Sequence, residues 1–531
     1  MVVGNRPVGR LSLYLTQAIH RAAATTPGAV ATTCAGRNRS WTEVKERVAR
    51  LAGALQALGV GTGDRVAILA MNSDRYFETY FAVPWAGAVI VPMNVRWSVA
   101  EHVYSIEDSG ATILIVDDVF LPTGLAVRKE CGGIRQVIYA GDGPVPEGLL
   151  GYEALVTEAA PAPDAGRNGN DLAGIFYTGG TTGFPKGVML SHQSLWTSSL
   201  CIGAGIGLTS SVRYIHAAPM FHLADGGMTY AATIYGGSHV FLPSFDASAF
   251  IALVEAERVT HALLVPTMIR LLLDCPDLAS RDISSFERLV YGASPMAESL
   301  LRTAMELLPG VGFVQAYGQT ELSPLATVLG AEWHVLKGPK AGKLRSAGRP
   351  GLCVEIRIVG ADGGEVPRGS VGEVCVRGPN AMLGYWNQPE QTAATLVDGW
   401  VHTGDGGYLD EDGFLYIVDR IKDMIVSGGE NVFSAEVENA LMQHPAVSEC
   451  AVIGVPDEKW GERVHAIVVP KEGHAVTADD IVAHCKALIA GYKCPRSVDV
   501  RSEPLPKSGA GKILKVDLRK PYWADKGRNV N

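Results

Sequence analysis

Hydrophobic positions in the first two thirds of the chain alternate between short apolar runs and helical spacings. Segment 44–58 has apolar residues at helical spacing, follows the capping box Ser40-Trp41-Thr42-Glu43 and ends at Gly59. Buried strands are predicted at 65–70, 113–116, 173–177, 261–265 and 288–291. The longest apolar run, 80–93, is short for a membrane span and predicts a buried helix and strand. The alternation predicts an α/β fold with largely parallel sheets, whose ligands bind at loops following the strands.

The pattern changes after about Ser346. Segments 354–359 and 372–376 predict a hairpin with a turn at Asp362-Gly363, and 409–418 predicts another. The charged run 419–423 follows, and behind it a new apolar pattern predicts a helix at 435–442 and a strand near 451–453. We therefore expect a small β-barrel-like subdomain, and a boundary between an N-terminal domain, 1–420, and a C-terminal domain, 422–531.

Composition narrows the class of protein. The chain has 531 residues, 47% of them hydrophobic, and a net charge of -9. This length predicts two or more domains, and the lack of a basic tract argues against a nucleic-acid partner. The nine cysteines are scattered without a C-x-x-C motif, so neither a disulfide framework nor a zinc site is indicated, and a reducing cytoplasm fits.

The run Tyr-Thr-Gly-Gly-Thr-Thr-Gly-Phe-Pro-Lys-Gly at 177–187 carries the strongest chemical signal. Its glycines leave backbone N–H groups free to approach an anion, its threonines add hydroxyl donors, and Lys186 adds a positive charge. That inventory suits a polyphosphate. It is not a Walker A loop, since Gly187 rather than Ser or Thr follows the lysine. Taken alone, the run equally fits a flexible connection between buried elements.

Other motifs follow in order along the chain. Segment 315–321 combines an aromatic residue, a glycine and a carboxylate; 401–405 places an acid at a strand end; 419–420 adds a cation; and 506–512 carries a lysine among glycines. Singly, Tyr317 fits a core aromatic, Asp405 fits a turn cap and Lys512 fits a solvated lysine.

Together these motifs closely resemble the adenylate-forming superfamily, in its branch of acyl-CoA synthetases and AMP-dependent fatty acid–CoA ligases. The resemblance covers about 11–520. It implies two α/β subdomains and a small β-barrel-like subdomain in the N-terminal domain, and a small mobile α+β C-terminal domain that rotates about a hinge at Lys422. It also implies a reaction in two steps, in which a carboxylate and ATP give acyl-AMP and pyrophosphate and a thiol then displaces AMP.

The resemblance assigns roles residue by residue. Lys512 would bridge the substrate carboxylate and the leaving oxygen, Thr178 and Glu321 would hold Mg²⁺, and His222 would line the acid pocket. Contacts to nucleotide and coenzyme A are expected at Thr178, Gly179, Gly180, Thr181, Thr182, Gly183, Lys186, Gly292, Ala293, Ser294, Gln315, Ala316, Tyr317, Gly318, Thr320, Asp405, Arg420, Lys422, Gly428 and Gly429. Catalytic roles are expected for Lys512, His222 and Glu321.

The sequence identifies the substrate acid and the acyl acceptor less directly than the nucleotide site. Leu223 stands where amino-acid-activating relatives place an Asp, although Asp225 is near, and Ala224, Gly226, Gly227 and Met228 suggest a roomy apolar pocket. A medium- or long-chain fatty acid is favoured, and a hydroxycinnamate-like aryl acid is the alternative. With no carrier domain after Asn531, coenzyme A is favoured as the acceptor. Loading of a separate carrier protein, a luciferase-like monooxygenase and a homodimer remain open.

Overall fold

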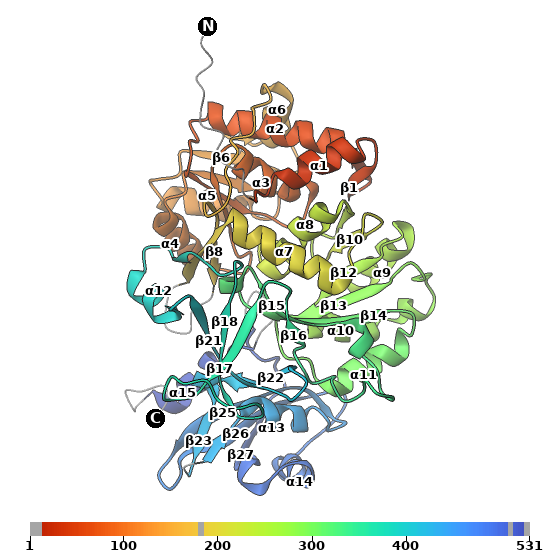
Figure 1. The fold of residues 1–531 in the computed structure, drawn as a ribbon, viewed down its shortest axis with the longest axis vertical. Coiled ribbons are helices and arrows are strands. Elements are labelled where there is room, and N and C mark those ends of the chain that lie inside the picture. Colours follow the sequence, from red (N-terminus) through yellow and green to blue (C-terminus); the bar gives the residue numbers. More distant parts are fainter. Residues whose placement is uncertain (1–12, 179–184, 429, 508–512, 525–531) are drawn as a thin grey trace.

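The computed structural model describes residues 13–178, 185–428, 430–507 and 513–524. Figure 1 shows the N-terminal α/β layers at the top, a small antiparallel sheet in the middle and the C-terminal domain at the bottom. This arrangement confirms the predicted fold class. In the described ranges, no helix is long and apolar enough to cross a membrane.

One sheet is built mainly from the segment 65–191, with strand order β19-β9-β8-β4-β3-β5-β6-β7. Strands β3 to β8 pair in parallel, whereas β9 and β19 add antiparallel edges. Its strands are β3 Arg65–Leu69, β4 Val89–Pro92, β5 Ile113–Val116, β6 Gln136–Tyr139, β7 Leu150–Gly151, β8 Leu172–Thr178, β9 Lys186–Ser191 and β19 Gly384–Tyr385. The helices of this region are α2 Trp41–Ala57, α3 Asp74–Trp85, α4 Val99–Ser109, α5 Leu121–Glu130, α6 Tyr152–Glu158 and α7 His192–Ile206.

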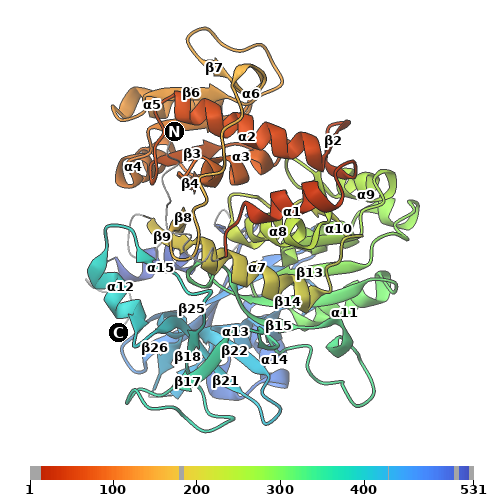
Figure 2. The same cartoon turned by 45° about the horizontal axis from the view of Figure 1, so that its top comes forward.

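A second sheet has the order β16-β15-β14-β13-β12-β10-β11-β1-β2. Its strands are β1 Val30–Cys34, β2 Arg37–Ser40, β10 Arg213–His216, β11 Ser238–Phe241, β12 His261–Leu264, β13 Arg288–Gly292, β14 Gly312–Gly318, β15 Leu325–Leu329 and β16 Arg349–Pro350. The associated helices are α1 Gln17–Thr25, α8 Leu223–Tyr235, α9 Ala247–Ala256, α10 Pro266–Leu273 and α11 Glu298–Leu307. Short 3₁₀ turns lie at Pro276–Ala279, Thr320–Leu322 and Ala331–Trp333. Figure 2 shows helices α1 and α7 running across the molecule near these strands.

The predicted hairpins form a half-barrel of antiparallel strands ordered β17-β18-β21-β20, with β22 beside β21. They are β17 Glu355–Val359, β18 Gly372–Arg377, β20 Leu396–Val397, β21 Trp400–Leu409 and β22 Leu415–Arg420, with helix α12 Pro389–Thr395 between them. Strand β21 continues well past Asp405. The expectation that this acid ends a strand is therefore wrong, because pairing with β22 extends through the Gly-rich segment that follows it.

The C-terminal domain follows the short turn Ile421–Asp423. It contains β23 Ile425–Ser427, β24 Glu430–Val432, α13 Ser434–Leu441, β25 Val447–Asp457, β26 Gly461–Pro470, α14 Ala478–Leu488, the 3₁₀ turn Gly491–Lys493, β27 Ser497–Val500 and α15 Lys515–Trp523. Apolar clusters lie on both faces of its sheet. This α+β unit therefore has a core of its own.

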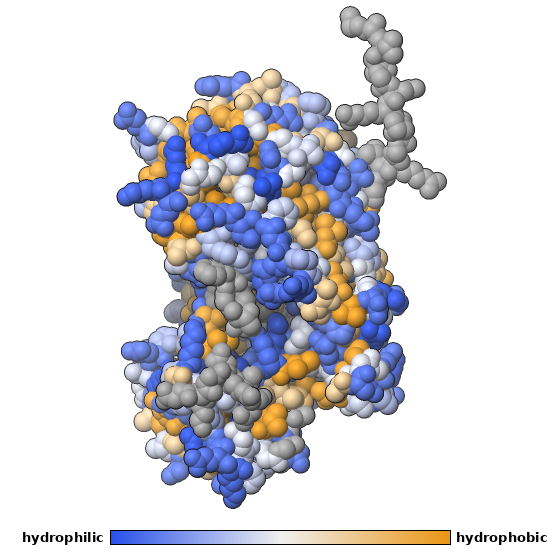
Figure 3. All heavy atoms as spheres, turned by 90° about the vertical axis from the view of Figure 1, so that its left-hand side faces the viewer, coloured by the Kyte–Doolittle hydropathy of each residue, from blue (hydrophilic) through white to orange (hydrophobic). Residues whose placement is uncertain are grey.

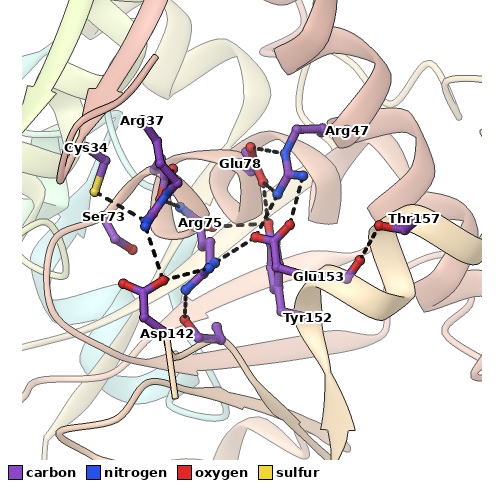
Figure 4. Close-up of polar contacts among 12 residues, drawn as sticks. Cys34, Arg37, Arg47, Ser73, Arg75, Glu78, Asp142, Tyr152, Glu153 and Thr157 are labelled. Atoms are coloured by element: carbon purple, nitrogen blue, oxygen red, sulfur yellow. Dashed lines mark hydrogen bonds and ion pairs between the residues drawn. The ribbon is translucent and has the colours of Figure 1, made fainter. Parts of the chain in front are cut away.

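A buried ionic network ties three helices of the N-terminal region together (Figure 4). From α2, Arg47 donates to Glu78 of α3 at 2.6 Å and to Glu153 of α6 at 2.9 Å. Arg75 of α3 donates to Glu153 at 2.8 Å, and the Tyr152 hydroxyl donates to Glu78 at 2.9 Å. Buried charges need such partners, because an unpaired charge in this environment is strongly destabilising. Removing any one member of this network should therefore destabilise the scaffold. All nine cysteines are free, so no disulfide contributes to the fold.

Candidate active site

A cleft of about 2150 Å³ lies where the two large sheets, the half-barrel and the C-terminal domain meet. Figure 3 shows one face of the molecule, hollowed between an upper and a lower lobe. The expected site residues that line the cleft are Thr178, Lys186, His222, Gly292, Ala293, Ser294, Gln315, Ala316, Tyr317, Gly318, Thr320, Glu321, Asp405, Arg420 and Lys422. Residues more than 240 positions apart in sequence thus share one cavity.

The glycine-rich run enters and leaves the cleft on two paired strands. Thr178 ends β8 and lies opposite Lys186 at the start of β9. The five intervening site residues, Gly179, Gly180, Thr181, Thr182 and Gly183, lie outside the described residues. The ends of the loop are fixed at the cleft wall, as expected for a strand-to-loop ligand site.

A carboxylate in the middle of β21 joins two other motifs. Oδ2 of Asp405 accepts a hydrogen bond from the Tyr317 hydroxyl at 2.7 Å, and Oδ1 forms an ion pair with Nε of Arg420 at 2.6 Å. Burial raises the pKa of Tyr317, and the neighbouring carboxylate raises it further, so the phenol remains a neutral donor. Asp405 is only 6% exposed. The structure thus brings β14, β21 and β22 together around one acceptor.

Glycines let two strand ends approach each other beside Tyr317. A Cβ on Gly292 would lie 2.2 Å from the carbonyl oxygen of Ala316, and one on Gly318 would lie 1.9 Å from that of Pro324. Either side chain would force backbone atoms apart, because real Cβ contacts are never so short. Gly292, Ala316 and Gly318 therefore form a flat backbone wall next to an aromatic ring, a surface that suits a planar base.

Glu321 lies on the 3₁₀ turn after β14, and its Oε1 accepts a hydrogen bond from the Tyr385 hydroxyl at 2.8 Å. Thr178 lines the same cleft. A hydroxyl and a carboxylate are oxygen donors of the kind that Mg²⁺ prefers, so the residues present fit this ion.

A Glu–Cys–His group, Glu373, Cys375 and His402, is the one cluster of its kind found in the described ranges. Both oxygens of Glu373 already have partners: Nδ1 of His402 lies 2.7 Å from Oε2, and the Gly404 N–H donates to Oε1 at 3.0 Å. Glu373 therefore braces the backbone immediately before Asp405.

The C-terminal domain contributes two residues next to the lysine-bearing segment to the cleft. Lys507 and Ile513, which flank 508–512, line the cavity, whereas Lys512 itself lies outside the described residues. Gly428 does not line it: its N–H donates to the carbonyl of Trp460 at 2.9 Å. Gly429 also falls outside the described part. In this arrangement the domain turns Lys507 and Ile513 toward the cleft, whereas Gly428 lies against Trp460.

His222 caps helix α8, where its Nδ1 accepts from the Ala224 N–H at 3.2 Å. Ala224 and Met228 line the cleft, as expected. Gly226 and Gly227 do not, and this part of the pocket expectation is wrong. A Cβ on Gly226 would lie 2.5 Å from the Tyr80 hydroxyl, so that glycine serves close packing in the core.

Asp225 has no role in binding a substrate amine in this arrangement. It is fully buried, and its two oxygens bond to the Tyr214 hydroxyl at 2.7 Å and to Nδ1 of His216 at 2.6 Å. On the other side of the His216 ring, Nε2 lies 3.0 Å from Nδ1 of His239. Because both oxygens of Asp225 already have partners inside the protein, this carboxylate is not available to a substrate amine.

Sequence reasoning missed two residues: Tyr385, which contacts Glu321, and Glu373, which contacts the segment before Asp405. Tyr385 lies on a strand of only two residues, too short to produce a periodic pattern. Glu373 lies inside a predicted strand, where nothing distinguishes its carboxylate from an exposed one.

The chain matches the family described as AMP-binding enzyme over residues 19–386, and the family described as AMP-binding enzyme C-terminal domain over residues 436–512. The chain belongs to the AMP-binding enzyme family. As a member, it is an AMP-forming acid–thiol ligase of the acyl-CoA synthetase type, and ATP is the substrate typical of such ligases.

Similar AMP-binding enzymes differ in the acid they are named for. A feruloyl-CoA synthase from Amycolatopsis sp is 42% identical over 94% of this chain and 98% of its own length. A medium/long-chain-fatty-acid–CoA ligase, FadD8, from Mycobacterium tuberculosis is 37% identical over 92% of this chain and 86% of its own. The structure of the anthranilate CoA ligase AuaEII in complex with anthranoyl-AMP has a TM-score of 0.89 at 28% identity and covers 97% of this chain and 98% of that one.

Proposed function

We propose that this protein joins an apolar carboxylic acid to coenzyme A in two steps within the cleft. A carboxylate oxygen attacks the α-phosphorus of ATP, the bond to the bridging oxygen breaks, and pyrophosphate leaves. The thiol sulfur then attacks the acyl carbon, AMP departs with the bonding electrons, and the thiol proton is released. The observation that carries this proposal is the junction of Tyr317, Asp405 and Arg420 in the same cleft as Glu321 and both ends of the glycine-rich loop.

Asp405 accepts the ribose hydroxyls in this proposal. A carboxylate is acceptor-only, so two hydroxyl donors suit its two oxygens, which the Tyr317 hydroxyl and Arg420 hold in place. The ring of Tyr317 and the backbone wall at Gly292 and Gly318 enclose the adenine.

In this proposal the phosphates bind among Glu321 and the two ends of the glycine-rich loop, Thr178 and Lys186. Negative charge increases on the phosphate oxygens as pyrophosphate leaves, so preorganised donors and cations lower the barrier. Thr178 and Glu321 would hold Mg²⁺, which supplies positive charge to the phosphates when bound. Lys512 completes the first step by orienting the carboxylate against the α-phosphate, and it approaches from the C-terminal domain.

Two domains share this chemistry. We place the N-terminal domain at 1–420 and the C-terminal domain at 422–531, with Lys422 as the hinge between them. The turn Ile421–Asp423 connects β22 to β23, and hinges of this kind absorb a large change in φ and ψ at a few residues. Rotation would withdraw Lys512 and bring Gly428 and Gly429 to the cleft for the thiol step.

Coenzyme A as the acceptor is supported by the surroundings of Gly428. The adjoining Trp460 ring carries two cations: the guanidinium of Arg496 lies 4.3 Å from its centroid and the ammonium of Lys459 lies 4.8 Å away. An aromatic ring with two positive charges beside it suits a phosphorylated nucleotide, which a carrier-bound arm lacks.

We expect an apolar acid, because the cleft beside His222 is lined by Ile202, Ala224, Met228 and Leu263. We place an aryl acid of the hydroxycinnamate type first, supported by the 42% identity to a feruloyl-CoA synthase and by the likeness to an anthranilate CoA ligase. A medium- or long-chain fatty acid, which the sequence alone favoured, is second and is supported by the FadD8 relative.

The test is acid-dependent pyrophosphate release from ATP with ferulate, coumarate, anthranilate, octanoate and palmitate, each with and without coenzyme A. We expect the aryl propenoates to give acyl-CoA with at least a tenfold higher kcat/KM than octanoate or palmitate. The reverse order would favour the fatty acid. Pyrophosphate release without any acyl-CoA would favour carrier loading, and no acid-dependent release with any acid would contradict adenylation.

A further inference from the structure

A short segment before helix α12 connects the acidic side of the phosphate end, at Glu321, to its basic side, at Lys186. Its Met382 N–H donates to the carbonyl of Glu321 at 2.9 Å. Four residues later, the Trp386 N–H donates to the carbonyl of Gly187, next to Lys186, at 2.7 Å. Segment 382–386 therefore spans the distance between the turn that carries Glu321 and the strand that leaves the glycine-rich loop.

Tyr385 occupies the middle of this connection. Its hydroxyl donates to Oε1 of Glu321 at 2.8 Å, and its ring centroid lies 5.2 Å from Nζ of Lys186. The residue is 7% exposed, and its backbone pairs with Val188 of β9. One side chain thus contacts a carboxylate through its hydroxyl and an ammonium group through its ring.

The two contacts are chemically suited to one residue. A phenol donates a hydrogen bond to a carboxylate, and the negative face of an aromatic ring attracts a cation. Burial raises the pKa of Tyr385 and the Glu321 carboxylate raises it further, so the hydroxyl keeps its proton. Without Tyr385, Glu321 and Lys186 could approach each other and neutralise their charges, which would remove both from the phosphates.

We propose that Tyr385 is a positioning residue that holds the Glu321 carboxylate in the orientation required for a divalent cation and keeps Lys186 apart from it. This inference rests on the proposed function, because it assigns Glu321 and Lys186 to the phosphate end of a nucleotide. It adds a residue from β19, the edge strand of the first large sheet, to the phosphate end of the site.

Two substitutions separate the two contacts. Tyr385→Phe removes the hydroxyl and keeps the ring, so it releases Glu321 alone. Tyr385→Leu removes the ring as well and also releases Lys186. Tyr235→Phe is the matched control, because the Tyr235 hydroxyl also donates a hydrogen bond, to the carbonyl of Leu200 at 3.1 Å, and Tyr235 does not line the cleft.

The experiment measures Mn²⁺ binding to the full-length protein in the presence of a non-hydrolysable imido analogue of ATP, by electron paramagnetic resonance of free Mn²⁺. Mn²⁺ accepts the same carboxylate and water ligands as Mg²⁺. Loss of a partner that orients a metal ligand typically weakens metal affinity by 10- to 100-fold. We expect Tyr385→Phe to weaken Mn²⁺ binding by about tenfold, with the analogue's affinity without metal unchanged. Tyr385→Leu should also weaken binding of the analogue without metal, and Tyr235→Phe should match the wild type in both affinities.

A cycle with Glu321→Gln tests whether the hydroxyl acts through Glu321. If it does, Tyr385→Phe should change Mn²⁺ affinity by less than twofold in the Glu321→Gln background. Full additivity, or wild-type Mn²⁺ affinity in Tyr385→Phe, would overturn the proposal. The readout needs no knowledge of the acid. A wild type that binds Mn²⁺ and the analogue but releases no pyrophosphate with any acid would refute the proposed function and leave the role of Tyr385 standing, whereas no metal–nucleotide binding would refute both.

Discussion

Replacing Asp405 by Asn tests the nucleotide site at its most connected residue. The carboxylate receives the Tyr317 hydroxyl on one oxygen and Arg420 on the other. An amide retains one acceptor oxygen and turns a donor NH₂ toward one of these two donors. The substitution therefore removes the negative charge and leaves either the phenol or the guanidinium without an acceptor.

The magnitude follows from the lost contacts. Hydrogen bonds to a charged group contribute about 1.5–3 kcal/mol each, and the amide keeps roughly half of this capacity. A net loss of about 2 kcal/mol corresponds to an ATP affinity lowered by about 30-fold. The effect on folding should be smaller, about 1 kcal/mol, because the Arg420 side chain is 39% exposed and water can replace part of the ion pair.

Isothermal titration with ATP, 2′-deoxy-ATP and 3′-deoxy-ATP measures the contact directly. The wild type should bind each deoxynucleotide about tenfold more weakly than ATP, while Asp405→Asn should lose this preference for at least one of them. Asp412→Asn is a suitable control, since this acid lies at the tip of the same hairpin and pairs with Lys343 at 2.8 Å away from the cleft. If Asp405→Asn still discriminates between ATP and both deoxynucleotides as the wild type does, the ribose assignment is refuted.

Three further outcomes are expected. Lys512→Ala should reduce pyrophosphate release at least 100-fold more than it slows acyl transfer from supplied acyl-AMP; equal losses in both half-reactions would contradict its role in the first step alone. Trp460→Ala should raise the KM for coenzyme A about tenfold and leave pyrophosphate release unchanged, and an unchanged KM would argue against the nucleotide surface. Burial works to raise the pKa of Asp74, but Arg39 and Arg37 outweigh it and leave that pKa below its usual value. As the pH falls toward 3, the Asp74 carboxyl therefore binds more protons in the unfolded state than in the folded state. The free energy of unfolding, measured in urea, should be constant above about pH 4 and decrease below it, by at most about 1.4 kcal/mol per pH unit for this group. A flat profile from pH 6 to 3 would contradict this.

Much of the fold was predictable because its elements carry local signals. Buried parallel strands are continuous apolar runs, and the predicted strands at 113–116 and 261–265 are found as β5 and β12. The capping box at Ser40 and Glu43 forms as expected. The hairpins after Ser346 were visible through their Asp-Gly turns.

The geometry of the site was less accessible to sequence. The Tyr317–Asp405 hydrogen bond joins residues 88 positions apart, and the Tyr385–Glu321 bond joins residues 64 apart. The first contact depends on how the half-barrel packs on the second sheet, and the second depends on how edge strand β19 of the first sheet meets the turn after β14. No local pattern encodes either arrangement. Gly226 was misplaced for a related reason, because a helical glycine can face either a cavity or a closely packed neighbour such as Tyr80.

The central claim is that the carboxylate is activated as an acyl-adenylate, and isotope transfer tests it most directly. A single turnover with acid labelled in both carboxylate oxygens with ¹⁸O, ATP and coenzyme A should yield AMP that contains one ¹⁸O atom and acyl-CoA that retains the other. This follows because the oxygen that attacks the α-phosphorus leaves with AMP in the thiol step. Unlabelled AMP, or ADP and phosphate in place of AMP and pyrophosphate, would contradict the account.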